Sequence, residues 1–313
     1  MSDKRATREA FGATLVELAN EGIEVVVVEA DLSKSTTTAT FEKAYPKRFF
    51  NAGIAEQNMI GTAAGLAVGG KVAFTGSFAV FATGRAYDQV RNTVCYAGLN
   101  VKLCPTHSGI TVGPDGGSHQ MVEDIALMRV LPGMRVLVPA DARAAAAAIR
   151  VAATTPGPFY VRLGRAPVPV IYDEGFEFEL GRAYVLREGT DVTIASCGVM
   201  VERALAAAEL LAAGGVSAEV LDVATIKPID VDTIVASVSK TGAIVTAEEH
   251  SIIGGLGSAV AEVIGEHVPA PLRRVGVKDV FGTSGDPEEL MVHYGLTATD
   301  IASAAREVMT ARV

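Results

Sequence analysis

The stretch around which this chain is organised spans residues 49–67 and has the sequence FFNAGIAEQNMIGTAAGLA. Its second half consists of small and apolar residues, which predicts a buried helix whose glycines and alanines let another element pack closely. Glu56 lies in the first turn of that helix. A carboxylate there is stabilised by the helix dipole, whereas burial raises its pKa. Glu56 is therefore a candidate site residue, with an exposed helix-end charge as the alternative.

Composition and charge limit the class of protein. With 313 residues the chain is long enough for two domains, and its 49% hydrophobic content and 32 glycines are typical of tightly packed α/β folds. The formal net charge of −9, without a block of Lys or Arg, argues against nucleic-acid binding, and a phosphorylated ligand would need arginines around it. The N-terminal residues and the rest of the chain lack a long apolar run, which predicts a cytoplasmic protein without a membrane span.

Strands alternate with helices in the first half of the chain. The β-branched run IEVVVV at residues 23–28 predicts a parallel strand that is buried on both faces. Further strands are predicted at 71–75, 100–104, 134–138 and 159–163, and helices at 5–20, at the Glu56 segment, at 79–97 and at 141–153. This alternation is typical of βαβ units around a mostly parallel sheet.

A second unit follows a break in the pattern. Prolines and polar residues mark residues 166–182 as a linker. The alternation then resumes, with strands predicted at 191–196, 217–223, 243–247 and 272–277 and helices at 201–213, 257–267, 287–294 and 298–312. The sequence thus predicts two doubly wound α/β domains, residues 1–165 and the smaller 183–313.

Polar and aromatic side chains of the first domain follow predicted strands at the points where the strands end. The residues placed there are Asp31, Ser35, Ser77, Phe78, His107 and Arg165. In open α/β sheets, ligands bind beyond the carboxyl ends of parallel strands. Because these ends lie on one edge of the sheet, we expect a binding site along that edge.

The loop after the third predicted strand, residues 105–120, has the sequence PTHSGITVGPDGGSHQ. Its glycines and prolines allow the backbone to fold over a ligand, and His107, Asp115 and His119 supply groups for acid–base chemistry. A flexible, solvated surface loop is the alternative. Metal binding by these three residues is disfavoured, because their spacing matches no helix-borne ligand pair and the glycines would hold the ligands loosely.

The segment that follows the second predicted strand has two interpretations. Phe78 and Phe81 stand one helical turn apart, a spacing typical of core residues, but their position at the expected edge of the sheet favours a stacking platform. Residues 85–91 include Arg85 and Arg91, and we interpret this segment as an interface patch.

The second domain contains a weaker candidate site. The sequence GGLGSA at residues 254–259 resembles half of a dinucleotide-binding loop, but no acidic residue stands at the expected offset, so helix packing is the favoured interpretation. Lys227 and His250 also follow predicted strands and leave a minor site open there.

Several of these motifs together resemble transketolase. They are GIAEQ at residues 53–57, the Phe78 and Phe81 pair, RAYDQVR at 85–91, and the loop from His107 to Gln120. FGTSG at 281–285 and YGL at 294–296 extend the likeness to the end of the chain. The resemblance covers only the pyrimidine-binding and C-terminal domains of a full transketolase, and GIAEQ alone is shared with many thiamine diphosphate enzymes.

The resemblance implies thiamine diphosphate as the cofactor and assigns residues to it. Glu56 would hydrogen-bond the aminopyrimidine ring of the cofactor and favour its imino tautomer. Phe81, with Phe78 nearby, would pack on the same ring. Asp31 would belong to this cofactor pocket, close to the subunit interface.

The resemblance also implies the substrate contacts. His119 would assist proton transfer to and from the sugar hydroxyls, and Asp115 would recognise one of those hydroxyls. The sugar phosphate would be held by Arg8, Ser35, His107 and Arg165. Arginines suit this task because their bidentate fork matches a phosphate, and they would offset the negative charge of the whole chain.

The sequence departs from the family pattern at two points. A transketolase binds Mg²⁺ and the diphosphate through a Gly-Asp-Gly motif followed downstream by Asn, and this chain contains no Gly-Asp-Gly. We therefore expect a separate N-terminal subunit to hold the metal and the diphosphate in an α2β2-like assembly, with no metal ligand supplied by this chain. The second departure is Gly84, which stands where the family has a third aromatic residue.

The implied function is the transfer of a two-carbon ketol unit from a ketose phosphate to an aldose or aldose phosphate, as in the pentose phosphate pathway. The β subunit of a 2-oxo-acid dehydrogenase and a 1-deoxyxylulose-5-phosphate synthase-like enzyme are the alternatives with related chemistry. His107, His119 and Arg165 favour a sugar phosphate over an oxo acid. A non-catalytic regulatory or scaffold subunit is the alternative of another class, and Glu56 and His119 argue against it.

Overall fold

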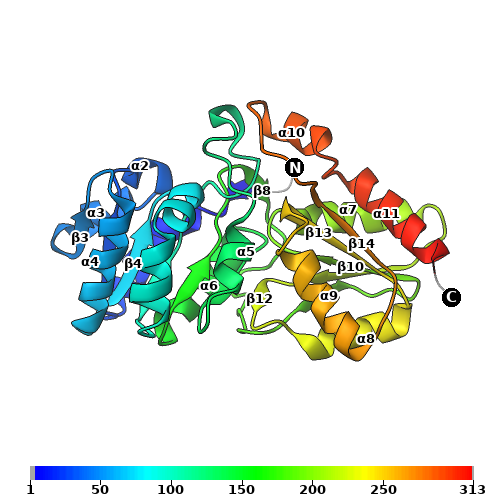
Figure 1. Cartoon of the computed structure of the whole chain (residues 1–313), viewed down its shortest axis with the longest axis horizontal. Helices are drawn as coiled ribbons and strands as arrows, with labels where there is room; N and C mark the ends of the chain where they lie inside the picture. The colour runs from blue at the N-terminus through cyan, green and yellow to red at the C-terminus, as the bar shows by residue number, and fades with distance from the viewer. Residues whose placement is uncertain (1–3, 312–313) are drawn as a thin grey trace.

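A computed structural model describes residues 4–311 of the protein. Two α/β lobes lie side by side, the first coloured blue to green and the second green to red (Figure 1). Each lobe is built on a mostly parallel sheet with helices on both faces. This architecture confirms the predicted fold class of two doubly wound α/β units.

The first sheet has seven strands, and one of them comes from beyond the predicted linker. Its strand order is β12 (Thr225–Lys227), β6 (Arg135–Leu137), β7 (Phe159–Val161), β5 (Val101–Leu103), β4 (Val72–Gly76), β2 (Val25–Glu29) and β3 (Phe49–Asn51). All neighbours pair in parallel except β12 and β6, which are antiparallel. Strand β2 is buried throughout, which explains its unbroken run of valines.

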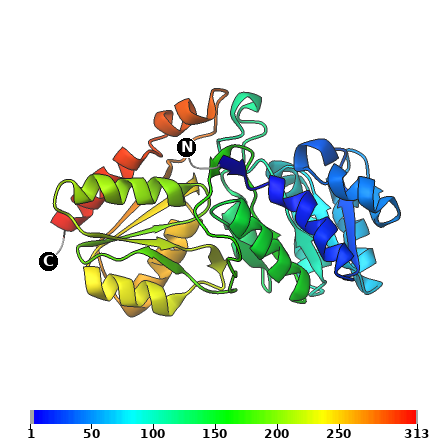
Figure 2. The same cartoon turned by 180° about the vertical axis from the view of Figure 1, so that it is seen from behind.

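Helices cover both faces of the first sheet. Helix α4 (Glu56–Val68) lies on one face, and α1 (Glu9–Asn20) and α6 (Ala142–Thr154) pack against each other on the opposite face (Figure 2). The Asp141 side chain caps α6 by accepting a hydrogen bond from the Ala144 amide at 2.8 Å. The lobe also contains three short α-helices: α2 (Ser33–Thr36), α3 (Ala39–Ala44) and α5 (Asp124–Arg129).

The second sheet has five strands in the order β14 (Leu272–Val277), β13 (Ile244–Ser251), β10 (Val192–Ser196), β11 (Ala218–Asp222) and β9 (Tyr184–Arg187). Only β9 is antiparallel to its neighbour. The helices of this lobe are α7 (Met200–Ala212), α8 (Val231–Thr241), α9 (Leu256–His267), α10 (Pro287–His293) and α11 (Ala298–Thr310). The apolar core under α8 and α9 continues into the core of the first lobe, so the two lobes share a packed interior.

The N-terminal segment differs from the prediction of one helix over 5–20. Lys4–Ala6 forms strand β1, and the helix begins only at Glu9. Strand β1 pairs antiparallel with β8 (Pro167–Pro169), which lies inside the predicted linker. Proline cannot donate to a ladder, so β8 is confined to a two-stranded ribbon outside the main sheets. The local helical periodicity could not reveal this pairing, because the partner lies over 160 residues away.

The segment predicted as one helix over 79–97 is a second correction. It contains two wide π-helical segments, η2 (Val80–Arg85) and η3 (Gln89–Cys95). Such turns are uncommon and often occur at functional sites. Here η2 ends at Arg85, whose side chain meets Glu56 on helix α4. An apolar periodicity predicts a helix but does not distinguish a π-turn from an α-turn.

Helix α4 buries only one of its faces. Its buried residues are Glu56, Met59, Ile60, Ala63 and Ala64. Gly61 and Gly65 lie on the exposed side, and a Cβ on either would meet no atom within 4 Å. The predicted close approach of another element to these glycines is therefore wrong for residues 4–311.

Two elements of the second lobe end at other residues than predicted. Helix α11 ends at Thr310, and residue 312, the predicted end of that helix, lies outside the described residues. Strand β13 continues to Ser251, beyond the predicted end at 247. Among residues 4–311, no helix combines the length and the apolar character that crossing a membrane requires.

Candidate active site

The carboxyl edge of the first sheet carries several of the candidate residues. Strands β2, β4, β5 and β7 pair in parallel, so their carboxyl ends share one edge. Asp31 follows β2, Phe78 follows β4, His107 follows β5 and Arg165 follows β7. A backbone bridge between Phe78 and Thr106 extends the pairing of β4 and β5 beyond the strands. The loops that carry Phe78 and His107 are therefore adjacent.

Four rings from these loops form a cluster, which we call the ring cluster: Phe78, Phe81, His107 and His119. The rings of Phe78 and His107 stack with their centroids 3.8 Å apart, and the Phe78 and Phe81 centroids lie 6.0 Å apart. His119 meets the Phe81 ring edge-on at 5.5 Å. The two ends of the 105–120 loop therefore converge on the two phenylalanines. The alternative of a flexible, solvated loop does not fit this packing.

Glu56 joins the ring cluster through Arg85. The Glu56 side chain is only 2% exposed, although it lies in the first turn of α4, and it forms an ion pair with Arg85 at 2.9 Å. The Arg85 guanidinium also lies over the Phe81 ring, 4.7 Å from its centroid. A buried carboxylate thus lies close to an aromatic wall. Its counter-ion is the half-exposed Arg85, whose guanidinium can turn into solvent without being buried unpaired.

Two arginines line a cavity beside the ring cluster. The cavity has a volume of about 330 Å³, and its lining includes Arg8, Arg165 and Thr111. Burial, together with the charge of Arg165, lowers the pKa of the Arg8 guanidinium. The Arg8 Nε is buried and has no hydrogen-bond partner among the described residues. The cavity is thus lined by two guanidinium groups that repel each other, one of which has a buried donor without a partner, and also by Glu9.

His107 is held neutral next to these arginines. Burial lowers its pKa to about 3, and the charges of Arg8, Arg165 and His119 act in the same direction. Its backbone φ of 60° lies in the left-handed region, which a residue other than glycine seldom adopts. Such a backbone is retained where the surroundings enforce it. His107 therefore adds a neutral imidazole, rather than a third positive charge, to the surroundings of Arg8 and Arg165.

Other candidate residues lie at the margin of this cluster. Asp31, with a φ of 62°, exchanges hydrogen bonds with the Asn51 side chain. Ser35 is held through its carbonyl oxygen, which accepts from Arg8 Nη1 at 2.7 Å. Asp115 is exposed on the turn Gly113–Asp115, and no contact among residues 4–311 joins it to the ring cluster. Gly84 is exposed, and a Cβ there would meet nothing within 4 Å.

Sequence reasoning missed Glu29, which organises the loop that carries Asp31 and Ser35. The Glu29 carboxylate is fully buried and accepts hydrogen bonds from the Thr36 and Thr38 hydroxyls and from the amides of Ala30 and Leu32. Burial raises its pKa. A single charge at the end of an otherwise apolar strand is the sequence signal that could have identified it.

The second-lobe candidates have structural roles. The amides of Leu256 and Gly257, at the start of α9, donate to the buried Glu248 carboxylate, so the chain itself occupies the place of a phosphate. The helix-packing interpretation of GGLGSA is thereby confirmed. Lys227 Nζ donates to the carbonyls of Arg129 and Leu131, and His250 is buried with Nδ1 at 2.7 Å from the Ser251 carbonyl. No cluster of ligating side chains suited to a metal occurs within residues 4–311.

The depressed pKa of His107 predicts a pH dependence of stability. Between pH 6.5 and pH 3 the unfolded chain binds a proton at this histidine while the folded chain does not, so stability falls as the pH falls. His107→Asn removes this titration, and Asn tolerates the left-handed backbone. Denaturant unfolding should show that, between pH 6.5 and pH 5, the free energy of unfolding falls by about 1.6 kcal/mol more for wild type than for the variant. Replacing the exposed His293 by Asn is the control. The prediction would be contradicted if the free energies of unfolding of wild type and His107→Asn differed by the same amount at both pH values.

Comparison with known proteins identifies both lobes. Residues 3–170 match the transketolase pyrimidine-binding domain, and residues 181–301 match the transketolase C-terminal domain. The fold resembles a solved split-gene transketolase, described as an inactive β4 tetramer, with a TM-score of 0.92 and 52% identity over 99% of this chain and all of that one.

Two relatives of similar length have described activities. A 6-deoxy-6-sulfo-D-fructose transketolase subunit of Clostridium sp. is 48% identical over 96% of this chain and 94% of its own length. One of the subunits of an apulose-4-phosphate transketolase of Phocaeicola vulgatus is 40% identical over 96% of this chain and 97% of its own length. Together with the two domain matches, these relatives show that the chain belongs to the transketolase family.

Proposed function

We propose that this chain is the C-terminal subunit of a split, thiamine diphosphate-dependent transketolase. The proposed reaction moves a two-carbon ketol unit from an anionic ketose to an aldose or aldose phosphate. The observation that supports it most is the convergence at one sheet edge of the buried Glu56, the ring cluster and the Arg8–Arg165 cavity. A carboxylate, an aromatic wall, histidines and an anion site are the groups that this chemistry requires.

The residues around Glu56 fit the aminopyrimidine part of the cofactor. Glu56 would accept or share a proton at the ring nitrogen, and the half-buried Phe81 and the buried Phe78 would pack against the ring face. Asp31 would contribute from the neighbouring loop. When bound, thiamine diphosphate supplies the nucleophilic carbon that accepts the ketol unit. Arg85 now pairs with Glu56, and its exposed side chain can withdraw when the ring nitrogen takes its place.

The substrate would extend from the ring cluster to the arginine cavity. His119 is half-buried and would hold or move a proton at a sugar hydroxyl oxygen, and Asp115 would accept a hydrogen bond from another hydroxyl. Arg8 and Arg165 would bind the anionic end, with Ser35 and the neutral His107 as hydrogen-bonding partners. The names of the relatives include a sulfonated sugar and a sugar phosphate, and this pair of arginines suits either anion.

The metal and the diphosphate would be held by a separate N-terminal subunit. The chain has no Gly-Asp-Gly motif, and no side-chain cluster in residues 4–311 suits a divalent metal. Two relatives of nearly equal length are themselves described as subunits. Helix α4, which begins at Glu56, presents Gly61, Gly65 and the 74% exposed Val68 to solvent. This smooth face suits close packing of the partner in an α2β2-like assembly.

Glu56→Ala tests the proposed role of the carboxylate. In the complex with the N-terminal subunit, we expect turnover to fall by about 100-fold or more, because the proton-holding contact to the cofactor is lost. The oligomeric state, measured by light scattering, should not change. The exposed Glu42→Ala is a matched control and should retain full activity. Full turnover by Glu56→Ala would contradict the proposed function.

Arg165→Ala tests the anion site. The variant should raise KM for phosphorylated or sulfonated ketoses by about 10-fold or more and leave KM for the uncharged sugar analogue unchanged, because only the charged end loses its partner. Arg203→Ala is the matched control, because Arg203 lines a neighbouring cavity but forms an ion pair with Glu288. Equal weakening for charged and uncharged sugars would argue against the anion role.

Gly65→Leu tests the subunit interface. The isolated variant should be at least as stable as wild type, because no atom lies within 4 Å of the new Cβ and leucine has a higher helix propensity than glycine. We expect its affinity for the N-terminal subunit, measured by titration calorimetry, to fall by about 10-fold or more, since overpacking a close contact costs roughly 1–3 kcal/mol. Gly265→Leu places the same side chain on an exposed position of α9 and is the control. Unchanged affinity for Gly65→Leu would place the interface elsewhere.

A further inference from the structure

The 105–120 loop carries His107 and His119, yet much of its anchorage comes from the second lobe. Ile110, together with Val122 just beyond the loop, belongs to the apolar core of that lobe, among residues of β10, α7 and α11. Gln120 Nε2 donates to the Ile110 carbonyl at 3.0 Å and to the Thr283 carbonyl at 2.9 Å. The loop is therefore anchored by the apolar core of the second lobe and by the backbone at Thr283, which lies 163 residues beyond Gln120.

Glu249 makes the central polar contact of this anchorage. It lies on β13 and is 3% exposed. Its Oε1 accepts a hydrogen bond from the Thr111 amide at 2.7 Å. A Cβ on Gly109, whose φ is +77°, would lie 2.2 Å from the Glu249 carboxyl carbon, so the backbone at Gly109 packs directly against the carboxylate. This contact sits between the two histidines in the sequence, four residues after His107 and eight before His119.

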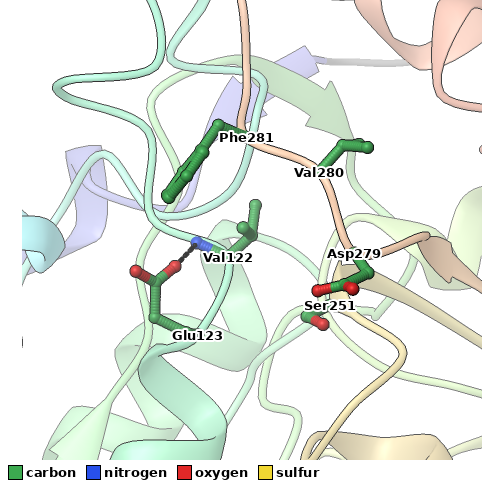
Figure 3. Close-up of a pocket in the computed structure, with 6 residues that line it drawn as sticks. All are labelled: Val122, Glu123, Ser251, Asp279, Val280 and Phe281. Atoms are coloured by element: carbon green, nitrogen blue, oxygen red, sulfur yellow. Dashed lines mark hydrogen bonds between the residues drawn. The ribbon is translucent and has the colours of Figure 1, made fainter.

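The base of the loop is fixed by the same strand. Arg162 Nη2 donates to the Glu249 carbonyl at 3.0 Å and to the Met121 carbonyl at 3.2 Å. Figure 3 shows the exit of the loop at Val122, with Ser251 and the segment that carries Phe281 around a pocket of about 250 Å³. The Ser251 amide donates to the Val122 carbonyl at 2.7 Å. Strand β13 thus holds the loop at Thr111 and again at its exit.

We propose that Glu249 is a positioning residue for the reaction, an inference that rests on the proposed function. Its carboxylate holds the backbone at Thr111, and thereby sets where His107 and His119 stand against Phe78 and Phe81. Burial raises the pKa of this carboxyl group, and the Arg162 charge opposes the shift. The second lobe supplies none of the ring-cluster side chains, so this tether gives it a direct part in the geometry of the site.

An acceptor oxygen, rather than the charge or mere bulk, is the feature that matters. Without Glu249 the Thr111 amide would be buried with no acceptor, and the loop would shift to satisfy it. Glutamine retains a carbonyl oxygen at nearly the same place, whereas alanine removes the acceptor and leaves a space. The Glu249→Ala and Glu249→Gln pair therefore separates positioning from general stability.

The experiment uses the full chain in complex with the N-terminal subunit. Glu249→Ala should lower kcat/KM by about 100-fold, the effect of a displacement of about 1 Å at catalytic groups. Glu249→Gln should retain most of the wild-type kcat/KM. Hydrogen exchange, followed by mass spectrometry on the full chain, should be faster in peptides covering 105–121 for Glu249→Ala and close to wild type for Glu249→Gln.

Glu219→Ala is the matched control. Glu219 is also a buried carboxylate of the second sheet, paired with Lys240, and it lies on β11 away from the loop. The control should lower the thermal midpoint without changing kcat/KM or exchange at 105–121. The proposal is overturned if Glu249→Gln is as impaired as Glu249→Ala, or if Glu249→Ala leaves exchange at 105–121 unchanged. A wild-type complex without transketolase activity would instead overturn the proposed function, and the exchange measurements would still decide whether Glu249 orders the loop.

Discussion

The buried ion pair between Asp124 and Arg162 is the interaction on which the arrangement of the site depends. Asp124 is fully buried and Arg162 is 7% exposed, so each charge would be costly alone, at about 3–5 kcal/mol. The pair is stable because its hydrogen-bonding groups are matched. Arg162 donates to both Asp124 oxygens and to the carbonyls of Met121 and Glu249, and the Tyr160 hydroxyl donates to Asp124. One arginine thereby connects the first sheet, the histidine loop and the second lobe.

Two arginines lie together in a protein whose overall charge is negative. The net charge of −9 is spread over the chain, whereas the cavity concentrates Arg8 and Arg165 at one sheet edge. His107 stays neutral there because burial and the adjacent guanidinium groups oppose its protonation. The local field is therefore set by side-chain placement rather than by composition, and the placement depends on loops held by both lobes.

The sequence was sufficient to predict strands and helices with clear periodicity, among them β2, α6 and α11, and the family of the chain. It placed α1 too early and treated 166–182 as a linker without strands, because the β1–β8 pairing is non-local. It missed β12, a strand from the second half of the chain that pairs with β6 in the first sheet. It also missed Glu29, Arg162 and Glu249, whose importance comes from burial and from partners remote in sequence.

The sequence by itself determined the chemistry available: a glutamate beside a helix of small residues, a loop with two histidines, arginines after strands, and no Gly-Asp-Gly motif. These features depend on residue type and local order, which a sequence records directly. Only the tertiary structure decided which groups meet. It stacked His107 on Phe78, paired Glu56 with Arg85, left Asp115 apart on an exposed turn, and tied Thr111 to Glu249. Those contacts join segments far apart in the chain, and their strength depends on the water-excluded surroundings that packing between these segments creates.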